Sequence, residues 1–203
     1  MIAVLDYGIG NLRSAQKALE RVGADAVLTA NPATVADADA VVLPGVGAFG
    51  RCMAALRSAG LEEPAREAID AGTPFLGICV GMQMLYDGSE EDPDVKGMGV
   101  LAGQVRRLPD GVKRPQMQWN VLQHGGSPLF DGLDQPAWVY FVHSYAPEAS
   151  PDVLATCDYG GPVTAAVARG RLWATQFHPE KSGPNGLRIL KNFVGSVGPV
   201  PGD

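Results

Sequence analysis

The feature that most constrains the fold is a short apolar run that ends in a cysteine between two glycines. Residues 74–83 read PFLGICVGMQ, so Gly77 and Gly81 lie two positions before and after Cys79. This pattern is typical of a nucleophile elbow, a sharp strand-to-helix turn that holds a reactive side chain on strained backbone. Glycine suits both positions, because a side chain there would crowd the turn. The alternative is a small cysteine buried in a core strand, a common place for free cysteine.

An elbow would give Cys79 the surroundings of a nucleophile. The helix that follows offers unpaired N-terminal amides, and its dipole favours the thiolate form of a cysteine. The N–H of Val80, directly after the nucleophile, is then one expected donor to an oxyanion.

A second stretch supplies the partners that such a nucleophile needs. Residues 175–180 read TQFHPE, and His178 is the expected general base for Cys79. Glu180 would orient the imidazole by accepting its other N–H. At strand spacing, residues i and i+2 point the same way, so we expect His178 and Glu180 to share one face. Pro179 fits the end of a strand better than its middle.

Length and composition describe an ordinary globular chain. Its 203 residues, 46% hydrophobic and 19% charged, fit one domain over 1–203 with a sizeable core and a frayed tail from about 198. The formal net charge of −6, without a basic run, argues against a nucleic-acid partner. Three cysteines without paired spacing favour a reducing compartment, so we expect a cytoplasmic protein. We expect no signal peptide and no membrane span.

The first half of the chain alternates strand and helix patterns. This alternation predicts a parallel sheet with helices on both faces. The expected strands are 2–5, 26–29, 40–43 and 75–78, the expected helices are 12–22, 50–58, 62–71 and 80–86, and residues 31–32 form a turn.

The second half changes character. Residues 87–97 are acidic with proline and glycine, which predicts a surface loop. We expect antiparallel additions to the parallel sheet. The expected strands are 100–108, 138–142 and 153–158, followed by a hairpin of 163–168 with 172–176 and a last helix from about Asn185.

A glycine motif after the third strand has two interpretations. Gly45-x-Gly47-x-x-Gly50 matches the dinucleotide fingerprint literally. It follows the third strand instead of the first, and the acidic residues about twenty positions on lie in a helical pattern, so we reject that function. We expect instead that the backbone of Gly45, Val46 and Gly47 supplies further donors to an oxyanion. A plain strand-to-helix turn is the structural alternative.

The remaining polar candidates gather at a predicted strand end. His143, Ser144 and Tyr145 follow an apolar run, where they could hold a small polar substrate or simply cap the strand. We interpret Cys52 and Cys157 as core residues. Because no His, Cys, Asp or Glu cluster has metal-ligand spacing, we expect no metal and no cofactor.

These motifs together resemble the class I, triad-type glutamine amidotransferases, which use Cys, His and Glu to hydrolyse glutamine and pass on the ammonia. Longer stretches are similar to the subfamily of glutaminase subunits of imidazole glycerol phosphate synthases. They span nearly the whole chain: residues 6–14, 43–49, 77–85, 98–100, 117–120, 140–145, 176–182 and 192–193.

The resemblance implies a flavodoxin-like three-layer fold and a heterodimer with a (β/α)8-barrel cyclase subunit. Ammonia from glutamine would react there with a phosphoribulosyl nucleotide, giving imidazole glycerol phosphate and an aminoimidazole carboxamide ribotide in histidine biosynthesis. It also implies that the oxyanion strand needs partner and nucleotide to present its amides. By likeness, the glutamine pocket contains Gln83, His143, Ser144 and Tyr145, and the partner face contains Asn11, Trp119, Asn120 and Lys181.

One position departs from the family pattern. Gln118 stands between Met117 and Trp119, where the family usually has glycine. Three alternative functions stay open at this point. They are a glutaminase for another amidotransferase, of the pyridoxal phosphate or anthranilate type, a cysteine peptidase or related hydrolase that needs no partner, and a non-enzymatic binding subunit. The last would be expected to carry a broken triad.

Overall fold

The computed structural model describes residues 1–198; of the tail predicted to fray, only Gly198 lies inside this range. The centre of the molecule is an eight-stranded sheet of order β2-β1-β3-β4-β13-β12-β11-β8. Its first five members run parallel, in the order typical of flavodoxin-like sheets. They are β1 (Ile2–Leu5), β2 (Ala26–Thr29), β3 (Ala40–Gly45), β4 (Phe75–Cys79) and β13 (Leu172–Thr175).

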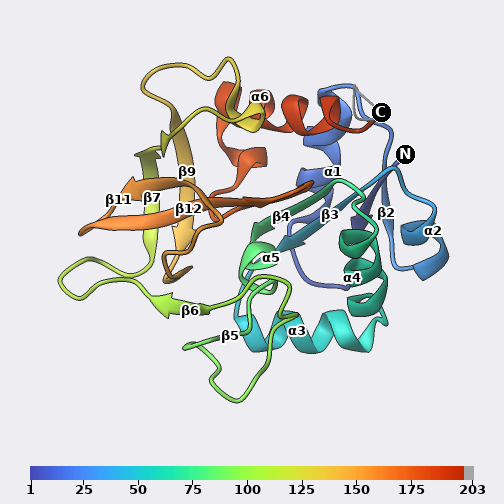
Figure 1. Cartoon of the computed structure of the whole chain (residues 1–203), viewed down its shortest axis with the longest axis horizontal. Helices are drawn as coiled ribbons and strands as arrows, with labels where there is room; N and C mark the ends of the chain where they lie inside the picture. Colours follow the sequence, from blue (N-terminus) through green and yellow to red (C-terminus); the bar gives the residue numbers. More distant parts are fainter. Residues whose placement is uncertain (199–203) are drawn as a thin grey trace.

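Helices cover both faces of the parallel strands, as Figure 1 shows. Because both faces are covered, β1, β3 and β4 are buried along their whole length and carry apolar residues at successive positions. One layer holds α1 (Leu12–Arg21) and α6 (Gly183–Gly195), which contact each other. The other layer holds α3 (Phe49–Ser58) and α4 (Glu62–Asp70). The expected three-layer fold is confirmed.

The antiparallel additions lie where the second half of the chain joins this sheet. Strand β12 (Pro162–Arg169) pairs antiparallel with β13, which confirms the predicted hairpin. Beyond it lie β11 (Val153–Asp158) and the short β8 (Gln123–His124).

Two small sheets flank the main one. The first joins β10 (Tyr145–Pro147), β6 (Gln104–Arg107) and β5 (Gly88–Ser89). The second pairs β7 (Gln116–Val121) with β9 (Trp138–His143), antiparallel. Two 3-10 turns complete the description, η1 (Pro128–Phe130) and η2 (Pro179–Lys181).

Several sequence predictions need correction. Residues 31–32 are not a simple turn, because Asn31 caps the short helix α2 (Pro32–Ala36) by accepting from the Ala33 N–H. The helix after the elbow, α5 (Val80–Gln83), is shorter than predicted. The strand expected over 100–108 is confined to β6.

Two further corrections concern strands that pattern analysis did not find. The acidic stretch 87–97 is not only a surface loop, because it contains the buried β5. Strand β7 was not predicted: three consecutive residues in its middle are exposed, so it lacks the alternation that marks a half-buried strand.

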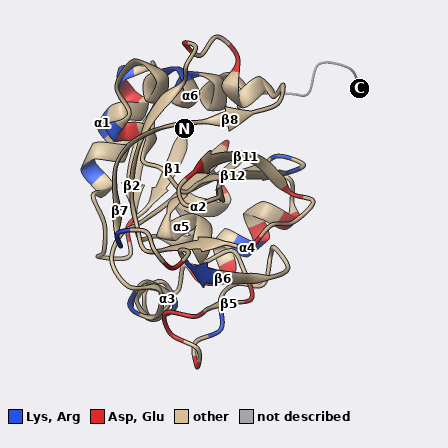
Figure 2. Ribbon diagram, turned by 90° about the vertical axis from the view of Figure 1, so that its left-hand side faces the viewer, with Lys and Arg blue, Asp and Glu red and all other residues tan. Residues whose placement is uncertain are grey.

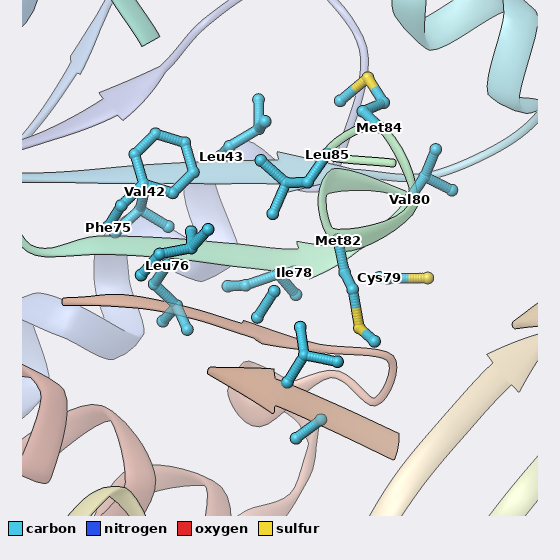
Figure 3. Close-up of a cluster of buried hydrophobic side chains, with 14 of the residues drawn as sticks. Val42, Leu43, Phe75, Leu76, Ile78, Cys79, Val80, Met82, Met84 and Leu85 are labelled. Carbon is cyan, nitrogen blue, oxygen red and sulfur yellow. The ribbon is translucent and has the colours of Figure 1, made fainter. Parts of the chain in front are cut away.

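The apolar core presses directly on the elbow. Figure 3 shows side chains of β3, β4 and the following segment packed together, with the Cys79 sulfur at the end of β4 pointing away from the cluster. The core therefore fixes the backbone of the elbow, while the Cys79 sulfur points out of the core.

Acidic and basic residues are spread over several elements (Figure 2). No helix within residues 1–198 is long and apolar enough to cross a membrane. The same residues contain no group of three or more His, Cys, Asp or Glu side chains arranged to hold a metal ion.

Candidate active site

The elbow has the strained backbone that its sequence predicts. Cys79 has φ 55° and ψ −111°, and among residues 1–198 it is the only non-glycine residue with positive φ. Such a conformation costs about 1–3 kcal/mol, so the surrounding structure must impose it. A Cβ on Gly81 would lie 1.9 Å from the Leu43 carbonyl oxygen, and one on Gly45 would lie 2.7 Å from the Gly81 nitrogen. Glycine at 45 and 81 lets β3 and the start of α5 touch through their backbones.

The predicted base and its orienting carboxylate are adjacent, but not for the reason expected. His178 Nδ1 lies 2.8 Å from Glu180 Oε1, and the two side chains are 1% and 4% exposed. They do not share a strand face, because β13 ends at Thr175 and Pro179 opens the turn η2. A tight turn, and not the two-residue period of a strand, places the carboxylate beside the ring.

The charge state of His178 depends on both neighbours. Burial opposes protonation of the ring, but hydrogen bonding and negative charge from Cys79 and Glu180 outweigh it and raise the pKa of His178 to about 9. Among residues 1–198, no group forms a hydrogen bond of standard geometry with His178 Nε2, so the ring and the Cys79 sulfur are neighbours without an aligned hydrogen bond between them. The ring of His178 is therefore predominantly protonated at neutral pH, with the Cys79 sulfur and the Glu180 carboxylate as its neighbours.

The sulfur of Cys79 has two further polar neighbours. It lies 3.9 Å from the Val142 carbonyl oxygen, to which the thiol donates. On another side, the Gln176 Nε2 lies 3.7 Å away and donates to the sulfur. Sequence reasoning assigned no role to Gln176. Its neighbours in the motif gave no signal of where its side chain points.

The expected oxyanion strand lies alongside the nucleophile. Gly45 pairs with Cys79 in the β3–β4 register, and Val46 and Gly47 line the cavity above the sulfur. The strand is held from behind: Tyr7 donates its hydroxyl to the Pro44 carbonyl at 2.5 Å, and the thiol of Cys52 lies 3.3 Å from the carbonyl of Val46. Since C=O and N–H of one trans peptide point in opposite directions, the Gly47 N–H is turned away from Cys52.

Two carboxylates hold the far end of this strand. Glu91 accepts from the Phe49 N–H at 2.9 Å, and Asp92 accepts from the Gly50 N–H at 2.7 Å. These hydrogen bonds satisfy N–H groups at the start of α3 that have no partner within the helix. Glu91 also lines the cavity. Sequence analysis missed it, because an acidic loop gives no sign of which carboxylate turns inward.

A cavity of about 400 Å³ joins the predicted site residues. Four of the predicted residues do not line it: Gly45, Trp119, Asn120 and Glu180, the last lying behind His178. Its lining is Asn11, Val46, Gly47, Cys79, Val80, Gln83, Glu91, Pro115, Val142, His143, Ser144, Tyr145, His178 and Lys181.

The expected pocket residues are tied to one another. Gln83 donates through Nε2 to the Tyr145 carbonyl at 2.9 Å. The ring nitrogens of His143 face the same carbonyl at 2.8 Å and the Gln116 amide at 2.9 Å. Burial lowers the pKa of His143 to about 4, so its ring is neutral at pH 7. His143 and Gln83 therefore shape a fixed wall around Ser144 and Tyr145.

The residues expected at a partner face lie near the mouth of this cavity or beside it. Asn11 and Lys181 line the mouth and are exposed. Trp119 is 47% exposed and packs edge-on against Tyr140. The Asn120 side chain is engaged within the chain, since it donates to the Asp158 carbonyl at 2.9 Å. Gln118, the departure from the family pattern, is exposed on β7.

Comparison with known proteins agrees with this geometry. The model of the family described as glutamine amidotransferase class-I matches residues 3–197. Imidazole glycerol phosphate synthase subunit HisH of Syntrophotalea carbinolica is 50% identical over 203 residues, covering 95% of this chain and 98% of the relative. The chain belongs to the class-I glutamine amidotransferases, within the HisH family. The HisH subunit of Deinococcus radiodurans is also 50% identical, over 204 residues that cover 98% of this chain and 95% of the relative.

Solved structures of lower sequence identity share the fold of this chain. A crystal structure of a glutamine amidotransferase matches with a TM-score of 0.73 at 24% identity, over 96% of this chain and 97% of that one. The structure of PurLQS from Thermotoga maritima matches with the same TM-score at 20% identity and the same coverage. At such identities the likeness concerns the fold alone.

Proposed function

We propose that this class-I glutamine amidotransferase hydrolyses glutamine to glutamate and ammonia through a thioester at Cys79. The ammonia passes to a (β/α)8-barrel cyclase subunit that makes imidazole glycerol phosphate and an aminoimidazole carboxamide ribotide in histidine biosynthesis. The observation that carries this proposal is the ring of His178, in contact with Glu180 on one side and close to the strained Cys79 on the other. Near full-length identity of 50% to HisH subunits supports the choice of pathway.

The first half of the reaction forms the thioester. The thiolate of Cys79 attacks the side-chain amide carbon, and the carbonyl oxygen becomes an oxyanion that accepts from Val80 and from the strand Gly45–Gly47. His178, protonated at Nε2, gives its proton to the leaving nitrogen as the C–N bond breaks. Ammonia departs and the acyl group stays on sulfur.

The second half regenerates the enzyme. His178, now neutral, takes a proton from a water molecule whose oxygen adds to the thioester carbon. The C–S bond breaks, glutamate leaves, and Cys79 returns as the thiolate beside a protonated His178. Glu180 keeps the ring oriented through both steps by accepting from Nδ1.

An apolar patch beside the cavity suits the docking of the cyclase. Met117, Trp119 and Trp138 are 61%, 47% and 47% exposed, although all three are large and apolar. They lie on the paired strands β7 and β9, and Met117 pairs with Val142, which lines the cavity. A barrel that covers this patch would also close the cavity against loss of ammonia. Three reduced cysteines fit the cytoplasm as the place of action.

The test is glutamate release from glutamine, by the chain alone and then with a cyclase subunit and its nucleotide ligand. We expect a low rate alone and a large rise in the complete mixture, because the partner is expected to present the oxyanion amides. High activity that the cyclase does not change would contradict the gating and the choice of partner. Activation by a subunit of another amidotransferase would favour that alternative, and hydrolysis of peptides would favour a cysteine hydrolase.

A further inference from the structure

A chain of buried amides connects a backbone carbonyl to the nucleophile. The Nε2 of Gln83 donates to the Tyr145 carbonyl at 2.9 Å and to Oε1 of Gln176 at 3.1 Å. The Nε2 of Gln176 lies in turn 3.7 Å from Cys79 Sγ. Gln83 is 3% exposed and Gln176 is fully buried.

Each link in this chain fixes the orientation of the next. A backbone carbonyl only accepts hydrogen bonds, so the Gln83 side chain must turn its NH₂ group toward Tyr145. The second proton of that NH₂ group then points at Gln176 and requires an acceptor, which is Oε1. The NH₂ group of Gln176 is left facing the sulfur. If the Gln176 amide were rotated by 180°, its NH₂ group would face the NH₂ group of Gln83, and its carbonyl oxygen would face the Cys79 sulfur.

We propose that Gln176 stabilises the thiolate of Cys79 with this N–H, in an orientation that Gln83 maintains. A hydrogen bond to an ion is stronger than one to a neutral group, so the N–H favours the charged sulfur over the thiol. It offsets the Val142 carbonyl, whose oxygen at 3.9 Å favours the thiol. This role deepens the proposed function and rests on it, since it assigns the contact a purpose in attack on glutamine.

The other titratable groups near the sulfur have separable effects. Tyr7 and Cys52 interact electrostatically with Cys79, but burial raises the pKa of Tyr7 far above neutrality and that of Cys52 to about 11. Both are therefore neutral at neutral pH. The other ionisable groups around the sulfur are His178 with its partner Glu180 and, lining the same cavity, Glu91 and Lys181, and all four are unchanged in the variants proposed below.

The same series of hydrogen bonds restricts which groups of a substrate Gln83 can bind. Both of its N–H donors are occupied inside the protein, and no hydrogen bond within residues 1–198 uses its Oε1. Since Gln83 lines the cavity, it meets the substrate as an acceptor.

The experiment is the pH dependence of alkylation of Cys79 by iodoacetamide, followed by mass spectrometry of the peptide that contains it. The full chain is compared with Gln176→Met, which keeps the volume and removes the N–H. We expect the pH midpoint to rise by about one unit, and so alkylation to slow about tenfold below both midpoints. Gln83→Met should move the midpoint the same way by less. Gln176→Glu, nearly isosteric, should move it at least as far, and serves if the Met variant does not fold.

The matched control is Gln116→Met, which removes a buried amide that faces another cysteine sulfur, that of Cys157 at 3.8 Å. It should leave the Cys79 midpoint unchanged. An unchanged midpoint in the folded Gln176 variants overturns the proposal, and so does an equal shift in the control. Alkylation needs no glutamine, so this test is independent of glutaminase activity. If the Gln176 variants shift the midpoint but the wild-type complex releases no glutamate from glutamine, the proposed function is refuted and the role of Gln176 is not.

Discussion

Two cysteines of this molecule are buried beside a glutamine amide, and only one is built to react. Cys79 ends a parallel strand on strained backbone, with His178 nearby and Gln176 donating to its sulfur. Cys157 lies within the antiparallel strand β11, fully buried, with the Gln116 amide 3.8 Å from its sulfur. Burial raises the pKa of Cys157 to about 11, so this thiol stays protonated.

The difference lies in what each amide is attached to. The Gln176 amide is oriented by a chain that begins at a backbone carbonyl, which can only accept. The Gln116 amide instead faces Nε2 of His143. Because Nδ1 of that neutral ring must donate to the Tyr145 carbonyl, Nε2 can only accept, and this contact fixes no N–H of Gln116 toward Cys157. Under the role proposed for Gln176, proximity of an amide to a sulfur is not sufficient for a reactive thiol, and a donor of fixed orientation and a nearby base are also required.

The largest expected effect separates the two cysteines by activity. Cys79→Ala should reduce glutamate release in the cyclase complex by roughly 10⁴-fold or more, because the thioester cannot form. Cys157→Ala should change the rate by less than about twofold and cost about 1 kcal/mol of stability through a small cavity. Substantial loss of activity in Cys157→Ala, with the fold intact, would break the comparison.

Alkylation of the native chain separates the same residues without any substrate. At pH 7 a thiol with a pKa of about 11 is ionised to about one part in 10⁴, which applies to Cys52 and Cys157. We therefore expect iodoacetamide to label Cys79 alone, and all three cysteines only after unfolding. Mass spectrometry of the labelled peptides is the measurement. Labelling of Cys157 at a rate near that of Cys79 would remove the distinction.

A smaller effect tests the orienting carboxylate. Glu180→Gln should lower glutaminase activity by about 10²- to 10⁴-fold, less than loss of the nucleophile, because Glu180 orients the base and does not react. Removing the negative charge should also lower the pKa of His178 below about 9. NMR titration of the His178 ring measures this directly. An unchanged His178 titration would show that Cys79 alone sets its charge state.

The smallest effect concerns His143, which lines the cavity at Cys79 and also contacts Gln116, the neighbour of Cys157. Its pKa is about 4 in the fold and about 6.5 in an unfolded chain, so the unfolded state binds more protons between these values. Stability should therefore fall as the pH drops from 6.5 to 4, by up to roughly 3 kcal/mol from this group. Urea unfolding of wild type and His143→Gln measures it, and the variant should show a shallower dependence. His124→Gln, which removes another histidine, should keep the wild-type slope.

The N-terminal half was predictable because its signals are local. Strands buried on both faces are apolar at successive positions, and helices between them show one apolar stripe, so β1, β3 and β4 could be located within a few residues. The edge strand β7 could not, because its middle is exposed and its apolar residues belong to a face that no part of this chain covers within residues 1–198.

In the candidate site, too, some residues could be identified from the sequence and others only from the structure. The sequence by itself was enough to propose Cys79, His178 and Glu180 as nucleophile, base and orienting carboxylate, because the glycines at an elbow and the His-Pro-Glu turn are short-range patterns. Tertiary structure alone decided that Gln176 points at the sulfur and that Glu91 turns into the cavity. Side-chain direction depends on neighbours far along the chain, such as Tyr145 for the buried amides and Phe49 for the carboxylate. Only the folded backbone places those neighbours within hydrogen-bonding distance.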